Sequence, residues 1–344
     1  MSISERKRDH LRAFDLDPEI ERGGSGFASI RLTHRALPEI NFDEIDTRTE
    51  FLGKALSFPL IIGSMTGGAD EEMMRINRHL AEAAEACQVG LAVGSQRIMF
   101  RHPKALRSFA LRDLAPTIPL LGNLGAVQLN KGFTLEHAEA AVSALQADGL
   151  YLHLNPLQEA IQPEGDLQFA GLSEKIMDLS QRLSVPVCVK EVGAGLSSVD
   201  IGLLAHGNIA YFDVAGRGGT SWSRIEYHRS NNDLGLLFQD WGLTTVEALC
   251  MAKANHPNQR FIASGGIRSG IDIAKALILG AEVCTIAAPF LKPAQESTEA
   301  VIRVIKTLHQ QYQTALFLLG CINNKALINQ HHLIIGGLPH AYRH

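Results

Sequence analysis

The chain has 344 residues and a formal net charge of −4, with 46% hydrophobic and 20% charged residues. This composition is ordinary for a folded enzyme and excludes a broad electrostatic surface for nucleic acid, while leaving room for a small basic pocket. No stretch reaches 18 uninterrupted apolar residues, so we expect neither a signal peptide nor a membrane span. The five cysteines form no C-x-x-C pair, which predicts reduced thiols in a cytoplasmic protein.

Short apolar segments recur along the chain, most of them starting roughly 30 residues after the one before, the length of a βα unit. The expected strands are 58–63, 89–93, 118–122, 150–154, 185–190, 209–214, 260–263 and 283–287. The clearest helical patterns between them are 71–86, the stretch from Thr134 to Ala147, and 269–279. Eight apolar strands alternating with helices predict an α/β fold, a (β/α)₈ TIM barrel, with an open doubly wound sheet as the alternative.

Three parts of the chain do not follow this repeat. Residues 1–57 are expected to form an N-terminal arm and extension of the same domain, before a barrel at 58–330 and a C-terminal tail at 331–344. The sixth and seventh strands are expected to start 51 residues apart, at Ile209 and Arg260. We therefore predict a long polar loop at 217–240, either functional or disordered.

Barrel enzymes place their chemistry where the strands end. Polar side chains and glycines follow the expected strands, including Ser64, Met65, Thr66, Ser95, Gln96, Arg97, Asn123, Gln128, His153, Asn155, Gln158, Glu159, Lys190 and Thr220. Loops are polar in any protein, so Lys190 at the end of an apolar strand is more informative than most of these. Asn123, lying between Gly122 and Gly125, is the second unusual position.

Two glycine-rich segments are typical of phosphate sites. They are GRGGTS at 216–221 and SGGIRSG at 264–270, and the second opens a predicted helix whose N-terminal amides can bind an anion. The loop after the seventh barrel strand is the usual phosphate position in this fold. Neither segment reads G-x-G-x-x-G, so a Rossmann-type dinucleotide site is not indicated.

Single residues leave alternatives open. Lys190 could stabilise the negative N1 region of a reduced flavin, pair with Glu191, or form a Schiff base. Glu159 beside Gln158 could bind Mg²⁺ or be a solvated loop carboxylate. The segment RKR at 6–8 is either a solvated basic tail or an arm that closes over a diphosphate. With two phosphate-type turns present, we favour flavin mononucleotide (FMN) as the ligand of Lys190.

Several segments together resemble the type 2 isopentenyl diphosphate isomerases, the FMN-dependent class. The resemblance runs from about residue 6 to about residue 320, and the matching segments, in order, are RKRDH (6–10), SMTGG (64–68), VGSQR (93–97), GNLGAVQL (122–129), LHLNPLQE (152–159), QPEGD (162–166), VKEVG (189–193), GRGGTSW (216–222) and SGGIRSG (264–270). Each motif is modest alone, and their number and order carry the resemblance.

The resemblance implies a role for each matching residue. FMN would be held by Ser64, Met65, Thr66, Ser95, Asn123, Lys190 and Thr220, and its phosphate by Gly265, Gly266, Ile267, Arg268, Ala287 and Ala288. The substrate would be held by Arg6, Lys7, Ser95, Gln96, Arg97, Asn155 and Gln158. Glu159 would bind Mg²⁺. The reactive centre would include Gln158, His153, Trp222 and Glu226.

The family reaction is the reversible conversion of isopentenyl diphosphate to dimethylallyl diphosphate. The resemblance implies that reduced FMN acts as acid and base, that NADPH reduces the flavin, and that Mg²⁺ binds the diphosphate. It also implies that the protein is a homo-oligomer. An FMN-dependent oxidoreductase of the 2-hydroxy-acid oxidase type is the first alternative. A non-catalytic phosphate-binding scaffold is the second, and the convergence of polar groups on one rim argues against it.

Overall fold

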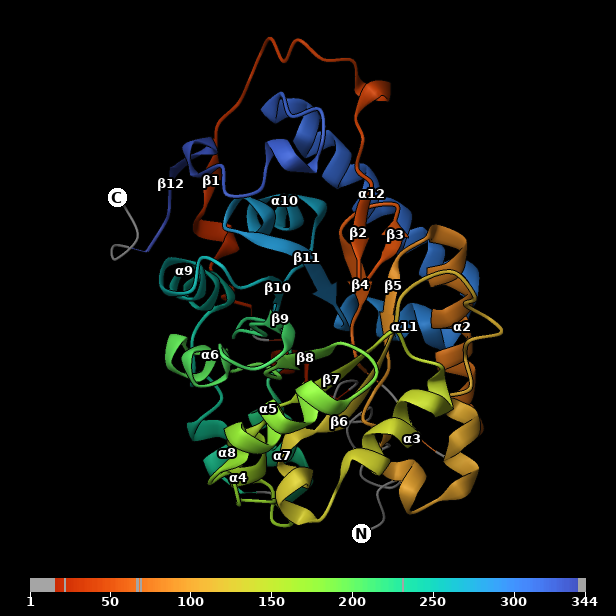
Figure 1. Ribbon diagram of the computed structural model, residues 1–344. Coiled ribbons are helices and arrows are strands. Elements are labelled where there is room, and N and C mark those ends of the chain that lie inside the picture. Colours follow the sequence, from red (N-terminus) through yellow and green to blue (C-terminus); the bar gives the residue numbers. More distant parts are fainter. Residues whose placement is uncertain (1–15, 22, 66–67, 69, 231, 340–344) are drawn as a thin grey trace.

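The structure is a computed structural model that describes residues 16–339 except 22, 66, 67, 69 and 231. Eight parallel strands close into a barrel in the order β10-β11-β4-β5-β6-β7-β8-β9 (Figure 1). They are β4 (Leu60–Ile62), β5 (Gly90–Ala92), β6 (Leu120–Gly125), β7 (Gly149–His153), β8 (Val187–Lys190), β9 (Ile209–Asp213), β10 (Phe261–Ser264) and β11 (Ala281–Ile286). Every expected strand is confirmed, and the closed barrel excludes the open doubly wound sheet.

Helices surround the barrel. They are α2 (Glu71–Cys87), α3 (Leu135–Leu145), α4 (Pro156–Ile161), α5 (Leu172–Arg182), α6 (Ser198–Leu204), α7 (Trp222–Ser230), α8 (Leu234–Leu237), α9 (Thr245–Asn255), α10 (Gly270–Ile278), α11 (Ala288–Glu296) and α12 (Thr298–Leu319). The three expected helical segments correspond to α2, α3 and α10. The capping boxes at Thr134 and Ser269 satisfy orphan N–H groups at the starts of α3 and α10.

The segment 217–240 is not the loop that its polar sequence predicts. It contains α7 and α8, and Ser223 at the start of α7 donates a hydrogen bond of 2.6 Å to the carbonyl oxygen of Gly235 in α8. Its apolar residues are too few and too irregular to produce a helical period. Packing against its neighbours therefore decides its structure, which the sequence pattern did not reveal.

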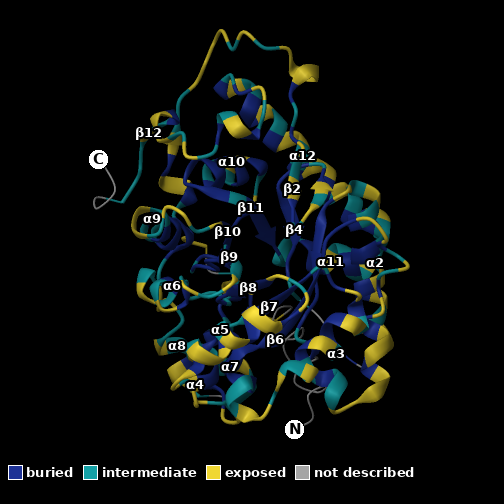
Figure 2. Ribbon diagram, in the orientation of Figure 1, coloured by how far each residue is buried: buried dark blue, intermediate teal, exposed yellow. Residues whose placement is uncertain are grey.

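The N-terminal end of the barrel is closed by a hairpin of β2 (Thr49–Phe51) and β3 (Lys54–Leu56). Phe51 and Leu56 are buried against one apolar side chain from each barrel strand: Ile61, Ala92, Leu121, Tyr151, Cys188, Tyr211, Ile262 and Val283. The strands of the barrel are mostly dark blue in Figure 2, and the exposed residues lie mainly on the helices and loops outside them. The barrel interior is thus a packed core at this end, and any cavity must lie at the other end.

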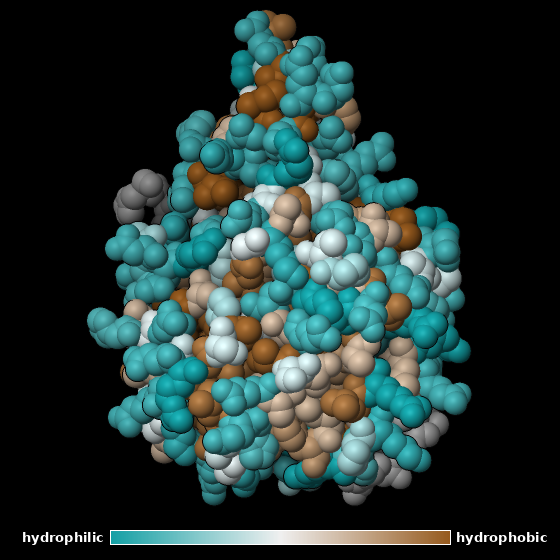
Figure 3. All heavy atoms as spheres, turned by 45° about the vertical axis from the view of Figure 1, so that its right-hand side comes forward, coloured by the Kyte–Doolittle hydropathy of each residue, from teal (hydrophilic) through white to brown (hydrophobic). Residues whose placement is uncertain are grey.

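A segment near the start of the described chain pairs with one near its end, beside the barrel. Strand β1 (Arg31–Leu32) pairs antiparallel with β12 (Ile334–Gly336). Hydrophilic residues cover much of the face in Figure 3, with hydrophobic residues gathered in patches between them. Within the described residues, no helix has both the length and the apolar character that crossing a membrane requires.

Candidate active site

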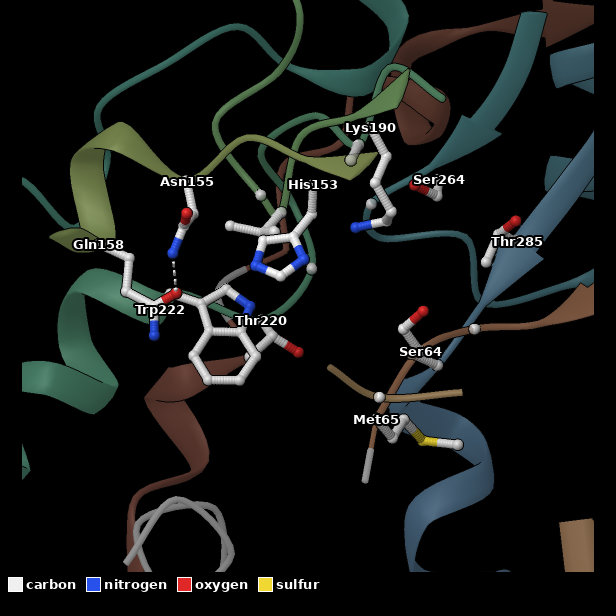
Figure 4. A pocket seen from close by; sticks show the side chains of 18 of the residues that line it. Ser64, Met65, His153, Asn155, Gln158, Lys190, Thr220, Trp222, Ser264 and Thr285 are labelled. Atoms are coloured by element: carbon white, nitrogen blue, oxygen red, sulfur yellow. Dashed lines mark hydrogen bonds between the residues drawn. The ribbon is translucent and has the colours of Figure 1, made fainter. Parts of the chain in front are cut away.

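A cavity of about 280 Å³ opens at the carboxyl ends of the barrel strands. Its lining comes from the ends of all eight strands and the segments that follow them, together with parts of α2, α4, α7 and α11. Figure 4 shows Ser64 and Met65 across this space from His153 and Trp222, with Lys190 between them. The side chains predicted from the strand ends therefore do converge.

The floor of the cavity follows from the period of a β-strand. Side chains two residues apart point to the same face, so the residues two positions beyond the apolar inward layer also point inward. This second layer is Gly63, Gly94, Asn123, His153, Lys190, Asp213, Ser264 and Thr285. The inward-facing residues of the lower layer are therefore apolar, whereas those two positions further along each strand are mostly polar residues or glycine.

Lys190 and Asp213 are two oppositely charged residues that are buried next to each other in this layer. They are register partners on β8 and β9, and they are 8% and 0% exposed. Asp213 accepts hydrogen bonds from Ser264 Oγ at 2.5 Å and from Tyr151 OH at 3.1 Å. Burial lowers the pKa of Lys190 and raises that of Asp213, while the attraction between the two opposes both shifts. Lys190 therefore places a cation at the cavity floor with a carboxylate behind it.

His153 is held as a neutral imidazole. Asn123 Nδ2 donates to the Val93 carbonyl oxygen at 3.1 Å, which leaves Asn123 Oδ1 as the acceptor for His153 Nδ1 at 2.7 Å. Burial first, and then the charges of Lys190 and Arg97, lower the pKa of His153 to about 3. The proton is thereby assigned to Nδ1, and Nε2 is an acceptor.

We expect His153 to stay neutral in solution from pH 8 to pH 5. Its ring ¹⁵N chemical shifts should report the Nδ1–H tautomer across this range, whereas a histidine peptide titrates near pH 6.5. Because the folded pKa lies below the unfolded one, the unfolded chain binds the proton first. The contribution of His153 to stability is therefore lost as the pH falls from about 6.5 toward 3. An imidazolium signal for His153 at pH 6 would contradict this assignment.

A hydrogen-bonded cluster lies on α4 and reaches α7. Asn155 Nδ2 donates to Gln158 Oε1 at 3.0 Å and to Glu159 Oε1 at 2.9 Å. Gln158 Nε2 donates to Glu226 Oε1 at 2.9 Å, and Glu226 is also in contact with the Arg229 guanidinium. Gln158 is thus held between a cavity residue and a fully buried carboxylate, which fixes the orientation of its amide.

The two glycine-rich turns pack backbone against backbone beside the cavity. A Cβ on Gly265 would collide with the carbonyl of Gly216, and one on Gly266 with that of Gly218. Both Gly265 and Gly266 have positive φ, 97° and 71°, a region that disfavours side chains. This close packing brings the main chain of both turns to the cavity wall, next to α10.

The residues present fit an FMN. The flavin expected from the sequence needs a cation for its ring system, hydrogen-bonding partners and a phosphate cradle. Lys190 supplies the cation, and the two glycine-rich turns supply the cradle. The start of α10, expected from the sequence to bind the anion, does not line the cavity, because Gly270 N donates to Gln311 Oε1 and Asp272 N donates to Ser269 Oγ. Ser64 Oγ is buried at the cavity and has no hydrogen-bond partner within the described part of the chain. A buried hydroxyl without a partner is costly, and a bound ligand would satisfy it.

Most of the residues expected at the site line the cavity: Ser64, Met65, Ser95, Arg97, Asn123, His153, Asn155, Gln158, Glu159, Lys190, Thr220, Trp222, Gly265, Gly266, Ile267, Arg268, Ala287 and Ala288. Gln96 does not. Its side chain is fully buried behind the wall, where it donates to the Ala141 carbonyl at 2.8 Å and accepts from the Asn123 N–H at 2.9 Å. Glu226 lies one hydrogen bond behind the lining. Arg6, Lys7 and Thr66 lie outside the described residues.

Three further residues contribute to the site although no role was expected for them, and two of these, Gln162 and Asp166, belong to the matching segment QPEGD. Asp213 lies behind Lys190, Gln162 lines the cavity beside Glu159, and Asp166 pairs with Arg97 at 3.1 Å. For Asp213 a signal existed, because it lies two residues beyond the inward-facing Tyr211. Gln162 and Asp166 are in a loop without periodicity, so only the folded chain shows their partners.

Comparison of the sequence with known proteins identifies the family to which this site belongs. The sequence model of the FMN-dependent dehydrogenase family matches residues 156–334. The isopentenyl-diphosphate delta-isomerase of Paracoccus zeaxanthinifaciens is 58% identical over 95% of this chain and 98% of its own length. The chain belongs to the isopentenyl-diphosphate delta-isomerase family. Another member, from Hydrogenovibrio crunogenus, is 56% identical over 92% of this chain and 94% of its own. The flavin expected from the resemblance is therefore supported by the FMN-dependent family match.

Among solved structures, the barrel is similar to a soluble mutant of the membrane-associated (S)-mandelate dehydrogenase from Pseudomonas putida. The TM-score is 0.68 at 16% identity, covering 97% of this chain and 100% of the other. A flavocytochrome b2 mutant gives the same TM-score at 16% identity, covering 93% and 81%. At these identities the likeness concerns the fold alone, and the isomerase relatives determine the family.

Proposed function

We propose that this protein catalyses the reversible isomerisation of isopentenyl diphosphate to dimethylallyl diphosphate, with FMN in its reduced form and Mg²⁺. The observation that carries the proposal is the shared cavity in which a buried lysine, two glycine-rich turns and the Gln158–Glu159 pair meet, in a chain 58% identical to a named isomerase.

FMN would occupy the side of the cavity between Lys190 and the glycine turns. Ser64, Met65, Asn123 and Thr220 would contact the flavin, with its phosphate on Gly265, Gly266, Ile267, Arg268, Ala287 and Ala288. Bound reduced FMN would supply the acid and base for the proton exchange, a task that needs a far stronger acid than an ordinary side chain when the base is an isolated alkene. Lys190 would hold a positive charge beside the ring system, with Asp213 keeping it in place.

The chain's own side chains would orient the hydrocarbon part of the substrate and keep water away. His153 is neutral and carries its proton on Nδ1, so its Nε2 can accept a hydrogen bond without placing a second cation at the centre. The Trp222 ring covers the side of the cavity opposite Met65 (Figure 4). Gln158, held by Asn155 and Glu226, presents a fixed amide to the reacting end. A positively charged organic intermediate is short-lived in water, so this enclosure matters.

The diphosphate would bind next to Ser95 and Arg97, with Mg²⁺ on Glu159. Mg²⁺ commonly takes only one or two protein carboxylates and completes its shell with phosphate oxygens and water. Glu159 fits this role because it is 6% exposed, lines the cavity and has an oxygen, Oε1, with a single donor, Asn155. Arg6 and Lys7 would add charge from the N-terminal arm.

The remaining parts of the proposal rest on the family resemblance. NADPH would reduce the flavin before turnover, the protein would be a homo-oligomer, and it would act in the cytoplasm. The test is an anaerobic assay with purified protein, FMN, Mg²⁺, limiting NADPH and isopentenyl diphosphate. Many molecules of dimethylallyl diphosphate should form per NADPH, and deuterium from D₂O should enter both substrate and product. Consumption of one NADPH per product would instead support an oxidoreductase of the 2-hydroxy-acid oxidase type.

A further inference from the structure

Asp166 gathers three polar side chains at the edge of the cavity. Its Oδ2 accepts from Arg97 Nη1 at 3.1 Å and from Gln128 Nε2 at 3.0 Å, and its Oδ1 is 3.3 Å from Lys131 Nζ. The side chains of Asp166 and Arg97 are each 17% exposed, so solvent screens this pair only in part. Arg97 and Gln128 line the cavity, whereas Asp166 does not. The carboxylate therefore lies behind the groups that would meet a ligand.

The backbone of Asp166 is tied to the other side of the same site. Its N–H donates to Glu159 Oε2 at 2.7 Å, and Gln162 Nε2 donates to that same oxygen. Gly165 makes the approach possible, since a Cβ there would overlap the main-chain carbonyl of Glu159. With two donors on Oε2 and only Asn155 on Oε1, Oε1 is the oxygen of Glu159 with capacity for a further partner.

We propose that Asp166 is a positioning residue for the metal–diphosphate complex, which orients Arg97 through its side chain and fixes Glu159 through its backbone so that Oε1 faces the metal. The proposal rests on the proposed function, because it concerns the same diphosphate and Mg²⁺ site. Asp166 itself touches neither ligand.

Asp166 should strengthen ligand binding because it restricts the rotamers of the Arg97 side chain before the ligand arrives. An unpaired Arg97 samples many rotamers, and ordering it on binding costs entropy. With Nη1 held by Asp166, the rest of the guanidinium is already placed at the cavity wall. Arg97 and Lys131 share one carboxylate, so the cluster keeps a net positive charge for an anion. Removing a residue that does not touch the ligand but holds a residue that does typically weakens binding of the metal by about 10- to 100-fold, and we expect an effect of this size for the anion as well.

Asp148 offers a matched control at the opposite end of the barrel. It also binds one arginine and one lysine, Arg112 at 2.7 Å and Lys54 at 2.8 Å, and it accepts the Leu120 N–H at 2.8 Å. Its side chain is 19% exposed, close to the value for Asp166. Asp166→Asn and Asp148→Asn therefore remove similar ion pairs, but only the first lies beside the proposed ligand site.

The test uses the FMN-loaded protein and inorganic pyrophosphate as the probe. Isothermal titration in the presence of Mg²⁺ should show pyrophosphate binding weakened about 10- to 100-fold by Asp166→Asn and unchanged by Asp148→Asn. In the same complexes, Mn²⁺ binding followed by electron paramagnetic resonance should weaken in the first variant only. Steady-state assays should show KM for the diphosphate substrate raised with kcat within a few-fold of wild type. Thermal unfolding should be affected similarly in both variants.

Pyrophosphate binding that is unchanged or tighter in Asp166→Asn would overturn the proposal, because Asp166 would then only neutralise Arg97. Equal losses in the two variants would overturn it as well, since they would indicate a general effect on folding. If wild type binds pyrophosphate and metal with the predicted contrast but does not isomerise the substrate, the positioning role stands and the proposed function fails. If wild type binds no pyrophosphate, both fail.

Discussion

Replacing Glu159 with Gln should lower isomerase turnover by about 100-fold or more, the upper end of the loss seen for groups that only support a metal ligand. The reason lies in the donors around the carboxylate. Gln162 and the N–H of Asp166 occupy Oε2, so a glutamine would keep its carbonyl oxygen there and turn its NH₂ toward the former Oε1 position. Asn155 can adapt, because its Oδ1 has no hydrogen-bond partner among the described residues. The position proposed for Mg²⁺ would then face a donor instead of an anion.

The measurement is the Mg²⁺ dependence of activity together with the FMN content of the purified variant. FMN should stay bound, since Glu159 lies on α4 and not beside the glycine turns. Glu174→Gln, a change at an exposed glutamate on α5, is the control and should have no effect. Full activity of Glu159→Gln with an unchanged Mg²⁺ requirement would make Glu159 a structural carboxylate.

Replacing Lys190 with Met should cost both stability and activity. The change removes the cation next to the buried Asp213 carboxylate. Because the two charges are not in direct contact, the loss should stay below the roughly 3 to 5 kcal/mol that breaking a direct buried ion pair typically costs. Activity should fall about 100-fold or more, the size of effect seen when one preorganised polar group is removed from a reacting centre. Urea unfolding and FMN titration by fluorescence quenching would measure stability and cofactor affinity separately.

The stability loss in Lys190→Met should depend on pH with a definite sign. Burial already raises the pKa of Asp213 above its usual value of 3.8 with Lys190 present, and without the lysine it should rise further. A carboxyl group with a raised folded pKa is tolerated at low pH and becomes destabilising as the pH rises through that value. The variant should therefore be closer to wild type at pH 5 than at pH 8.

The double change Lys190→Met with Asp213→Asn separates the two roles of the lysine. It removes the uncompensated carboxylate and should restore much of the stability at pH 8. FMN affinity and activity should stay low, because the cation is still missing. Recovery of FMN affinity in the double variant would mean that Lys190 serves only to neutralise Asp213.

The sequence by itself determined the barrel and the identity of most side chains at its mouth. Apolar runs of strand length separated by helical segments have few packed solutions, and the alternation of faces along a strand fixes which residues follow an inward position. The strand pattern alone therefore places Lys190, His153 and Asn123 at one rim. The domain limits at residues 57 and 330 and the arm residues Arg6 and Lys7 stay predictions.

Tertiary structure alone decided which residues support the site. The helices α7 and α8, the wall position of Gln96 and the link from Asp166 to both Arg97 and Glu159 all depend on contacts between particular residues of different segments. Such contacts leave no period in the sequence, because a hydrogen bond between loops requires only one compatible pair of side chains. The strand pattern repeats and can be recognised, whereas each supporting contact occurs once and becomes visible only when the chain is folded.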